Sequence, residues 1–145
     1  MNAKAGSNGF TLIEILVVVT IISILAAIVG VQVAPRLGEA KQSAAEAQIA
    51  VFEQALGVYR LRHGRYPTRE QGLAALCRKP EVEPIPENYP EEGYLDSREV
   101  PLDPWGREYV YFIPGPDGRP YEIVSYGADG EPGGEGENAE VSSAR

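Results

Sequence analysis

The chain has 145 residues, a net charge of −8 and a hydrophobic content of 43%. This length suits one domain with a modest core. The negative charge argues against a nucleic-acid or anionic-lipid surface and leaves cations as plausible partners. A single cysteine, Cys77, excludes an intrachain disulfide, and a single histidine, His63, excludes a histidine-based zinc site built from this chain alone.

A long apolar segment lies near the N-terminus. Residues 12–31 form a run of twenty residues whose one charge is Glu14. As a helix that rises ~1.5 Å per residue, this run would span ~30 Å, the thickness of one hydrocarbon layer. A removed secretory signal peptide is one alternative, but its apolar region would be shorter. An ordinary anchor with a stray acid is another. The run predicts a membrane-spanning helix.

Glu14 is the exceptional residue of this segment. A charged side chain in a membrane helix costs ~2.5–3.5 kcal/mol on insertion scales, which makes it a functional candidate. Phe10 and Glu14 lie four residues apart and therefore share a helix face. If the chain were cut between Gly9 and Phe10, the new α-ammonium could pair with the carboxylate of its own or a neighbouring chain.

The six residues from Gly9 to Glu14, GFTLIE, follow a short leader that contains Lys4. This arrangement resembles the prepilin peptidase site of type IV pilins and type II secretion pseudopilins. The resemblance implies cleavage after Gly9 and N-methylation of Phe10. It also implies that Glu14 pairs with the N-terminus of an adjacent subunit during assembly.

Beyond the apolar run, Pro35 removes one helical hydrogen bond and predicts a kink or a melted stretch before Gly38. From Glu39 the helical period resumes, and residues 64–67 (GRYP) end the helix. One apolar stripe recurs on it at a spacing of three and four residues, which predicts a face packed in the core. The stripe consists of Ile49, Phe52, Leu56 and Tyr59.

Shorter elements follow. Thr68 and Gln71 fit a capping box that opens a short helix whose buried side is Leu73 and Leu76. Four prolines make residues 80–90 an irregular surface loop.

Residues 108–113 and 121–126 are β-branched and aromatic, and a turn at 114–118 joins them, which predicts two antiparallel strands. A short third strand is expected near Tyr94 and Leu95. Trp105 is interpreted as a core or turn anchor.

Three further segments strengthen the resemblance: RYPTREQGLAAL at 65–76, LDPWGREYVY at 102–111 and SYGADGEPGGEGENAE at 125–140. In this order they are similar to the major pseudopilins of type II secretion, the general secretion pathway protein G family. The resemblance implies an α+β, type IV pilin-like fold. A long N-terminal helix, half of it transmembrane, would pack on a small antiparallel sheet, and a calcium-binding loop would follow.

The implied domains are a leader at 1–9, a transmembrane and assembly helix at 10–34, and a periplasmic domain at 35–145.

The C-terminal run at 127–138, GADGEPGGEGEN, is neither a phosphate loop nor an EF-hand, because it lacks the Gly-Lys-Ser/Thr and the twelfth-position glutamate. A disordered acidic tail and a hard-cation site both remain. The resemblance implies one Ca²⁺. Tyr126 and Glu131 would supply carbonyls and Asp129 a carboxylate.

The second carboxylate of that site stays open among Glu137, Glu140 and the amide of Asn138. The chain departs from the family here, since Glu140 stands where an aspartate is usual and a tryptophan-containing tail is missing. Pro35 also lies later than the family's proline.

No enzyme is expected. No G-x-S-x-G occurs, and the only imidazole that could activate a serine or Cys77 is His63.

By resemblance, the function is the repeating subunit of a periplasmic pseudopilus, a single-pass inner-membrane protein that joins a helical homopolymer. Its partners would be membrane lipid, the prepilin peptidase, the minor pseudopilins and the inner-membrane secretion platform, whose subunit addition drives folded proteins across the outer membrane. An adhesive or motility type IV pilin is the alternative within this fold. A tethered periplasmic calcium-binding module that never polymerises is the alternative outside it.

Overall fold

The computed structural model describes residues 9–144, without the side chains of residues 29–35. The predicted leader therefore lies outside the described residues except for Gly9. The chain divides between Arg36 and Leu37 into two compact units. Each unit is described by itself.

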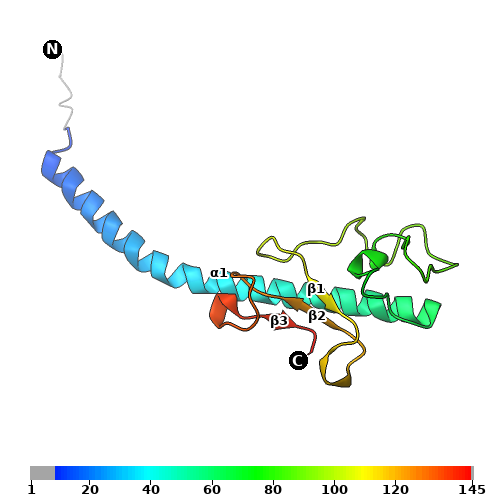
Figure 1. Cartoon of the computed structure of the whole chain (residues 1–145). Coiled ribbons are helices and arrows are strands. Elements are labelled where there is room, and N and C mark those ends of the chain that lie inside the picture. Colours follow the sequence, from blue (N-terminus) through cyan, green and yellow to red (C-terminus); the bar gives the residue numbers. More distant parts are fainter. Residues whose placement is uncertain (1–8, 145) are drawn as a thin grey trace, which may run out of the picture. The chain divides into compact units, whose positions relative to one another are not determined.

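One helix, α1, runs from Leu12 to His63, and each unit contains part of it (Figure 1). It ends where the Gly64 turn was expected. Of the kink or melted stretch expected at Pro35, the melted stretch is wrong, because the helix is assigned continuously through this position. A proline removes a single hydrogen bond, and a helix of 52 residues keeps the bonds on either side.

The first unit is the N-terminal part of α1, and its apolar side chains are exposed. Leu12 is 90% exposed and Ile28 is 55% exposed. The hydroxyls of Thr20 and Ser23 donate to the carbonyls four residues earlier, each at 2.7 Å, so these polar groups are satisfied within the helix. Among the residues that the structure describes, no helix is both long enough and apolar enough to cross a membrane.

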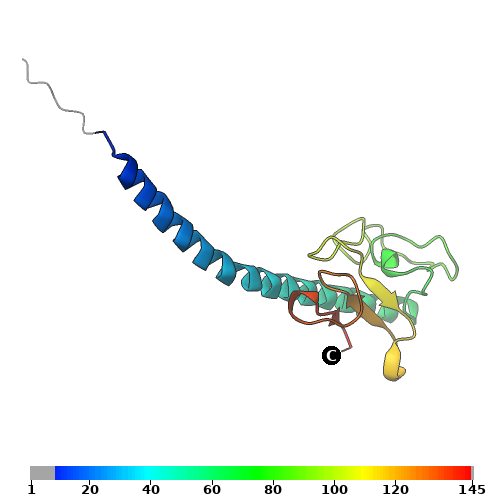
Figure 2. The ribbon, with the colours of Figure 1, turned by 60° about the vertical axis from the view of Figure 1, so that its left-hand side comes forward.

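The second unit is built on the apolar stripe of α1, which is buried as expected. Phe52, Leu56 and Tyr59 are completely buried and Ile49 is 3% exposed. The ring of Phe52 meets the ring of Tyr109 edge-on, with the centroids 5.1 Å apart. Figures 1 and 2 both show the strands lying alongside this half of α1. The stripe is therefore the centre of the core.

The sheet has three antiparallel strands in the order β1-β2-β3, which are Val110–Phe112, Glu122–Ser125 and Val141–Ser142. In register, Val110 opposes Val124, and Val124 opposes Ser142. A long helix with a small antiparallel sheet is the α+β arrangement that was expected, and this part of the prediction is confirmed.

The expected third strand near Tyr94 and Leu95 is wrong. Their backbone N–H groups instead donate to the carbonyl of Leu76, at 2.7 and 3.2 Å, and so attach the loop to η1 (Leu73–Leu76). The third strand, β3, comes from the C-terminal segment. The two remaining short helices are η2 (Pro116–Gly118) and η3 (Gly136–Asn138).

The capping pair Thr68 and Gln71 forms as expected. The Thr68 N–H donates to Gln71 Oε1 at 3.0 Å, and the Gln71 N–H donates to Thr68 Oγ1 at 3.3 Å. These bonds close a turn, and the regular helix η1 begins only at Leu73. Leu73 and Leu76 are buried, as predicted.

We expect Leu56→Ala to lower the free energy of unfolding of the full chain by roughly 2–5 kcal/mol, because it leaves a cavity in a packed core. Leu61→Ala is the matched control. Leu61 lies on the same helix but is 86% exposed, so its loss should change that free energy by less than about 0.5 kcal/mol. Urea unfolding in detergent measures both, and equal effects would contradict the assigned core face.

Candidate functional site

The first candidate site is the start of α1, where Glu14 meets Thr11. The backbone N–H and the hydroxyl of Thr11 donate to Glu14 Oε2 at 2.9 and 3.0 Å. The Glu14 N–H donates in return to Thr11 Oγ1 at 3.3 Å. This is a reciprocal capping box, which satisfies donors that the first turn of a helix leaves free.

This geometry adds a residue to the predicted site. Thr11 is a partner of Glu14 within the same chain, so a new N-terminus is not the only group that can satisfy the carboxylate. The Thr-x-x-Glu spacing is the sequence signal for this pair. Phe10, the expected first residue after cleavage, is 82% exposed.

The second candidate site is the C-terminal loop between β2 and β3. The Ala128 N–H donates to the carbonyl of Glu137 at 3.1 Å, and the Glu140 N–H donates to the carbonyl of Gly133 at 3.0 Å. Gly127 has a φ of +65°, and a Cβ there would lie 2.9 Å from the Asn138 backbone. These bonds make an ordered, closed loop, so the disordered-tail alternative does not describe it.

Two of the expected calcium ligands accept hydrogen bonds within this loop. Asp129 Oδ1 accepts the N–H of Glu131 at 3.1 Å, and the Tyr126 carbonyl accepts the N–H of Gly130 at 3.2 Å. Within the described residues, no three His, Cys, Asp or Glu side chains gather closely enough to hold a metal ion.

The two glutamates that were left open as the second carboxylate each interact elsewhere. Glu140 Oε2 accepts the N–H of Gly133 at 3.0 Å, and Glu137 Oε1 lies 3.8 Å from Lys41 Nζ on α1. For Asn138 the structure records only backbone bonds, such as its N–H donating to the Glu135 carbonyl at 3.2 Å, so its side-chain amide stays a candidate. The donors are nevertheless all oxygens within one short loop, and each bonded carbonyl or carboxylate keeps a free lone pair. Their chemistry fits a hard cation, although their side chains are not gathered around one point.

Asp103, which was not expected to carry a role, holds the loop's entry. It is 5% exposed. Its Oδ1 accepts the N–H groups of Trp105 and Arg107 at 3.0 and 2.8 Å, and its Oδ2 accepts the Ser125 hydroxyl at 2.6 Å. A buried carboxylate is tolerated when its oxygens are bonded in this way. Asp103 thus joins the turn around Trp105 to the end of β2, and Trp105 is a turn residue, as interpreted.

A buried phenol and a buried thiol stay protonated near neutral pH. Burial, with a smaller contribution from the charge of Asp103, raises the pKa of Tyr109 to about 12. Burial likewise raises the pKa of the Cys77 thiol, which is 6% exposed. A thiol that stays protonated is a poor nucleophile.

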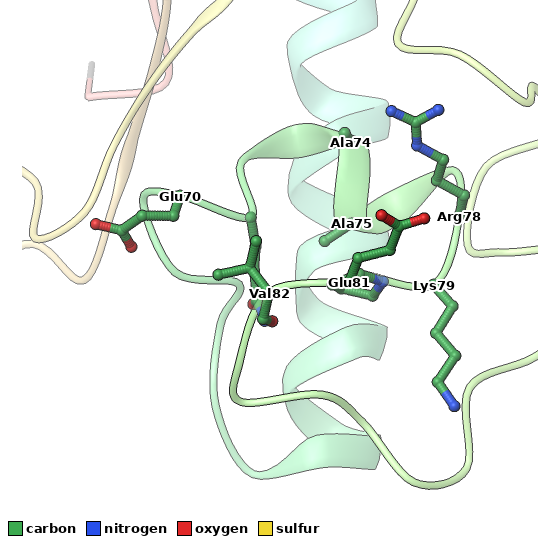
Figure 3. A pocket seen from close by; sticks show the side chains of 9 residues that line it. Glu70, Ala74, Ala75, Arg78, Lys79, Glu81 and Val82 are labelled. Carbon is green, nitrogen blue, oxygen red and sulfur yellow. The ribbon is translucent and has the colours of Figure 1, made fainter.

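One surface pocket, of about 450 Å³, lies beside η1 and is lined by residues 70–71, 74–75 and 78–82. Figure 3 shows the side chains of Glu70 and Lys79 at the two sides of this region, each pointing outward. The residues that line the pocket include no serine, cysteine or histidine. The pocket therefore offers no nucleophile and base in the arrangement that acyl transfer requires.

Comparison with known proteins places these sites in a family. Residues 32–144 match the family described as type II secretion system protein G, and residues 4–30 match the prokaryotic N-terminal methylation motif. The chain belongs to the type II secretion system protein G family. The expected methylation motif around Gly9 and Phe10 is thus present, while the cleavage position itself stays a prediction.

Relatives agree over nearly the whole chain. The type II secretion system core protein G of Pseudomonas aeruginosa is 46% identical over 134 residues, 92% of each chain. The core protein G of Vibrio cholerae is 43% identical over 141 residues, 97% of this chain and 94% of that protein.

A solved structure agrees as well. The major pseudopilin of the type 2 secretion system of enterohaemorrhagic Escherichia coli matches with a TM-score of 0.61 and 39% identity, over 72% of this chain and 87% of that chain. The resemblance drawn from the sequence, and with it the role of a major pseudopilin, is confirmed.

We expect Thr11→Ala to fray the start of α1, because it removes the hydroxyl that caps the Glu14 N–H. An N-cap residue contributes ~1 kcal/mol, so the amides of Glu14 and Ile15 should exchange with solvent roughly fivefold faster. Thr11→Ser keeps the hydroxyl and should preserve the protection. Hydrogen exchange in detergent, followed by mass spectrometry, checks both variants. Equal exchange in both would show that the hydroxyl does not cap the helix.

Proposed function

We propose that this chain is the repeating subunit of the type II secretion pseudopilus, a homopolymer that helps to export folded proteins across the outer membrane. The observation that carries the proposal is the match of residues 32–144 to protein G together with a methylation motif at 4–30. A pilin of an adhesive or motility fibre shares the architecture, but the relatives from Pseudomonas aeruginosa and Vibrio cholerae are secretion system proteins.

The proposed location is the inner membrane, with residues 35–145 in the periplasm. Supporting this is the exposure of the apolar side chains along 12–28, each of which would otherwise face water. Burying them in lipid, and then against the helices of neighbouring subunits, removes that cost. Lipid and other copies of this chain are thus the first partners.

The proposed maturation is cleavage between Gly9 and Phe10 by a prepilin peptidase, followed by methylation of Phe10. Among the residues that the structure describes, none apart from its chain neighbours comes within 4 Å of the position that a Cβ on Gly9 would take. The α-ammonium made by the cut is the cation proposed to pair with Glu14 of an adjacent subunit. The inner-membrane secretion platform and the minor pseudopilins are the remaining proposed partners.

We expect Glu14→Leu to insert and mature normally but to be absent from pseudopili. The substitution removes a desolvation cost on insertion and also removes the carboxylate proposed for pairing. Mass spectrometry of the membrane fraction should show a chain that begins at methylated Phe10. Electron microscopy of sheared fibres measures incorporation, and normal fibres would show that the pairing is dispensable.

Gly9→Trp is the control for the maturation step. It should accumulate as full-length precursor, since a bulky residue before the cut crowds the peptidase. If the wild-type chain instead begins anywhere other than Phe10, the assigned processing site is wrong, whatever Glu14 does.

We further propose that the C-terminal loop binds one Ca²⁺. Asp129 would supply a carboxylate, Tyr126 and Glu131 main-chain carbonyls, and Glu137, Asn138 or Glu140 a further oxygen. The supporting observation is a closed loop rich in oxygen donors and carrying five acids, Asp129, Glu131, Glu135, Glu137 and Glu140. A bound cation would offset the repulsion among these charges.

Calcium should raise the melting temperature of the full chain in detergent. At a free calcium concentration 100 times the dissociation constant, binding raises the free energy of unfolding by ~2.7 kcal/mol. Asp129→Ala should abolish the rise, and Glu135→Ala, which removes an acid outside the proposed ligand set, should retain it. A melting temperature that calcium leaves unchanged would mean that the loop is not a cation site.

A further inference from the structure

A guanidinium of the chain itself already lies on the loop's first turn. Arg107 Nη1 donates to the carbonyl of Gly127 at 2.9 Å and to the carbonyl of Ala128 at 2.8 Å. These oxygens belong to residues twenty and twenty-one positions later in the chain. A permanently charged donor therefore satisfies two neighbouring carbonyls at the point where the loop leaves β2.

The backbone that carries this side chain is itself fixed. The Arg107 N–H donates to Asp103 Oδ1 and the Asp103 N–H donates to the Arg107 carbonyl, both at 2.8 Å. Asp103 Oδ2 accepts the hydroxyl of Ser125, which is completely buried. One turn thus holds the chain at Ser125 through a carboxylate and at Gly127 and Ala128 through a guanidinium.

Gly130 shows how closely the loop wraps this guanidinium. A Cβ on Gly130 would lie 2.6 Å from Arg107 Nη1, and the residue has a φ of +77°. With the guanidinium in this position, a side chain at residue 130 would collide with it, and the left-handed φ also favours glycine. The Gly130 N–H closes the same turn on the Tyr126 carbonyl at 3.2 Å.

We propose that Arg107 is a positioning residue that keeps residues 126–131 folded without any divalent cation, so that a cation would order chiefly residues 132–140. The part that concerns the cation rests on the calcium binding proposed above. The physical reason is electrostatic: a loop with five acids needs positive charge nearby, and a guanidinium supplies it at every physiological pH.

Hydrogen exchange of the full chain in detergent, with a chelator or with calcium chloride, tests this assignment. In chelator, residues 126–131 of the wild type should be protected. In Arg107→Gln they should exchange ~5-fold faster or more, because the carbonyls lose a charged donor. Arg107→Lys should recover part of the protection, since an ammonium still donates to carbonyl oxygens. Calcium should slow exchange mainly at 132–140.

Arg98→Gln is the matched control, because it removes the same charge from another exposed position. Unchanged protection of β2 shows that each variant is folded. Equal exchange of residues 126–131 in Arg107→Gln and the wild type would overturn the proposal, and so would a wild-type segment that is unprotected in chelator. If calcium slows nothing at 132–140, the cation's part and the calcium site fail together, whereas the chelator result still decides the role of Arg107.

Discussion

The fold depends on burial of one face of α1. Strands of three, four and two residues cannot form a stable sheet alone, because so small a sheet buries too little apolar surface. The stripe centred on Phe52 and Leu56 provides that surface, and the inward side chains Ile123 and Val141 complete it, each almost wholly inaccessible to solvent. The helix is therefore the template on which the rest of the second unit folds.

A second dependence links the sheet to the loop. Because β3 lies beyond the loop in sequence, the loop must return the chain to the sheet for Val141 and Ser142 to pair with β2. The loop itself carries almost no apolar residues, so burial of apolar surface cannot order it. Its order comes instead from backbone hydrogen bonds and from the turn at Asp103. Hydrogen bonds at one end of the sheet thus hold the loop in place, and the loop in turn positions β3 against the core.

The sequence predicts what is local. Three features were predicted correctly because each depends on residues a few positions apart. They are the stripe of α1, the two longer strands and the Thr68–Gln71 pair. β3 could not be predicted from the sequence, because a strand of two residues shows no periodicity. The roles of Asp103 and Arg107 were not predicted because the partners that join them to the loop, Ser125 and Gly127, lie about twenty residues away in sequence. Pro35 does not end α1, although a proline removes one helical hydrogen bond.

Assembly through Glu14 must compete with bonds that the carboxylate already makes. In the single chain it accepts two hydrogen bonds from Thr11, both from neutral donors. A neighbouring α-ammonium would offer charge-assisted bonds, which are about twice as strong as neutral ones. That advantage is small in water, where an exposed ion pair contributes little, and grows where lipid excludes water. The proposed pairing would thus be favoured within the membrane, while Thr11 satisfies the acid of each subunit before it joins.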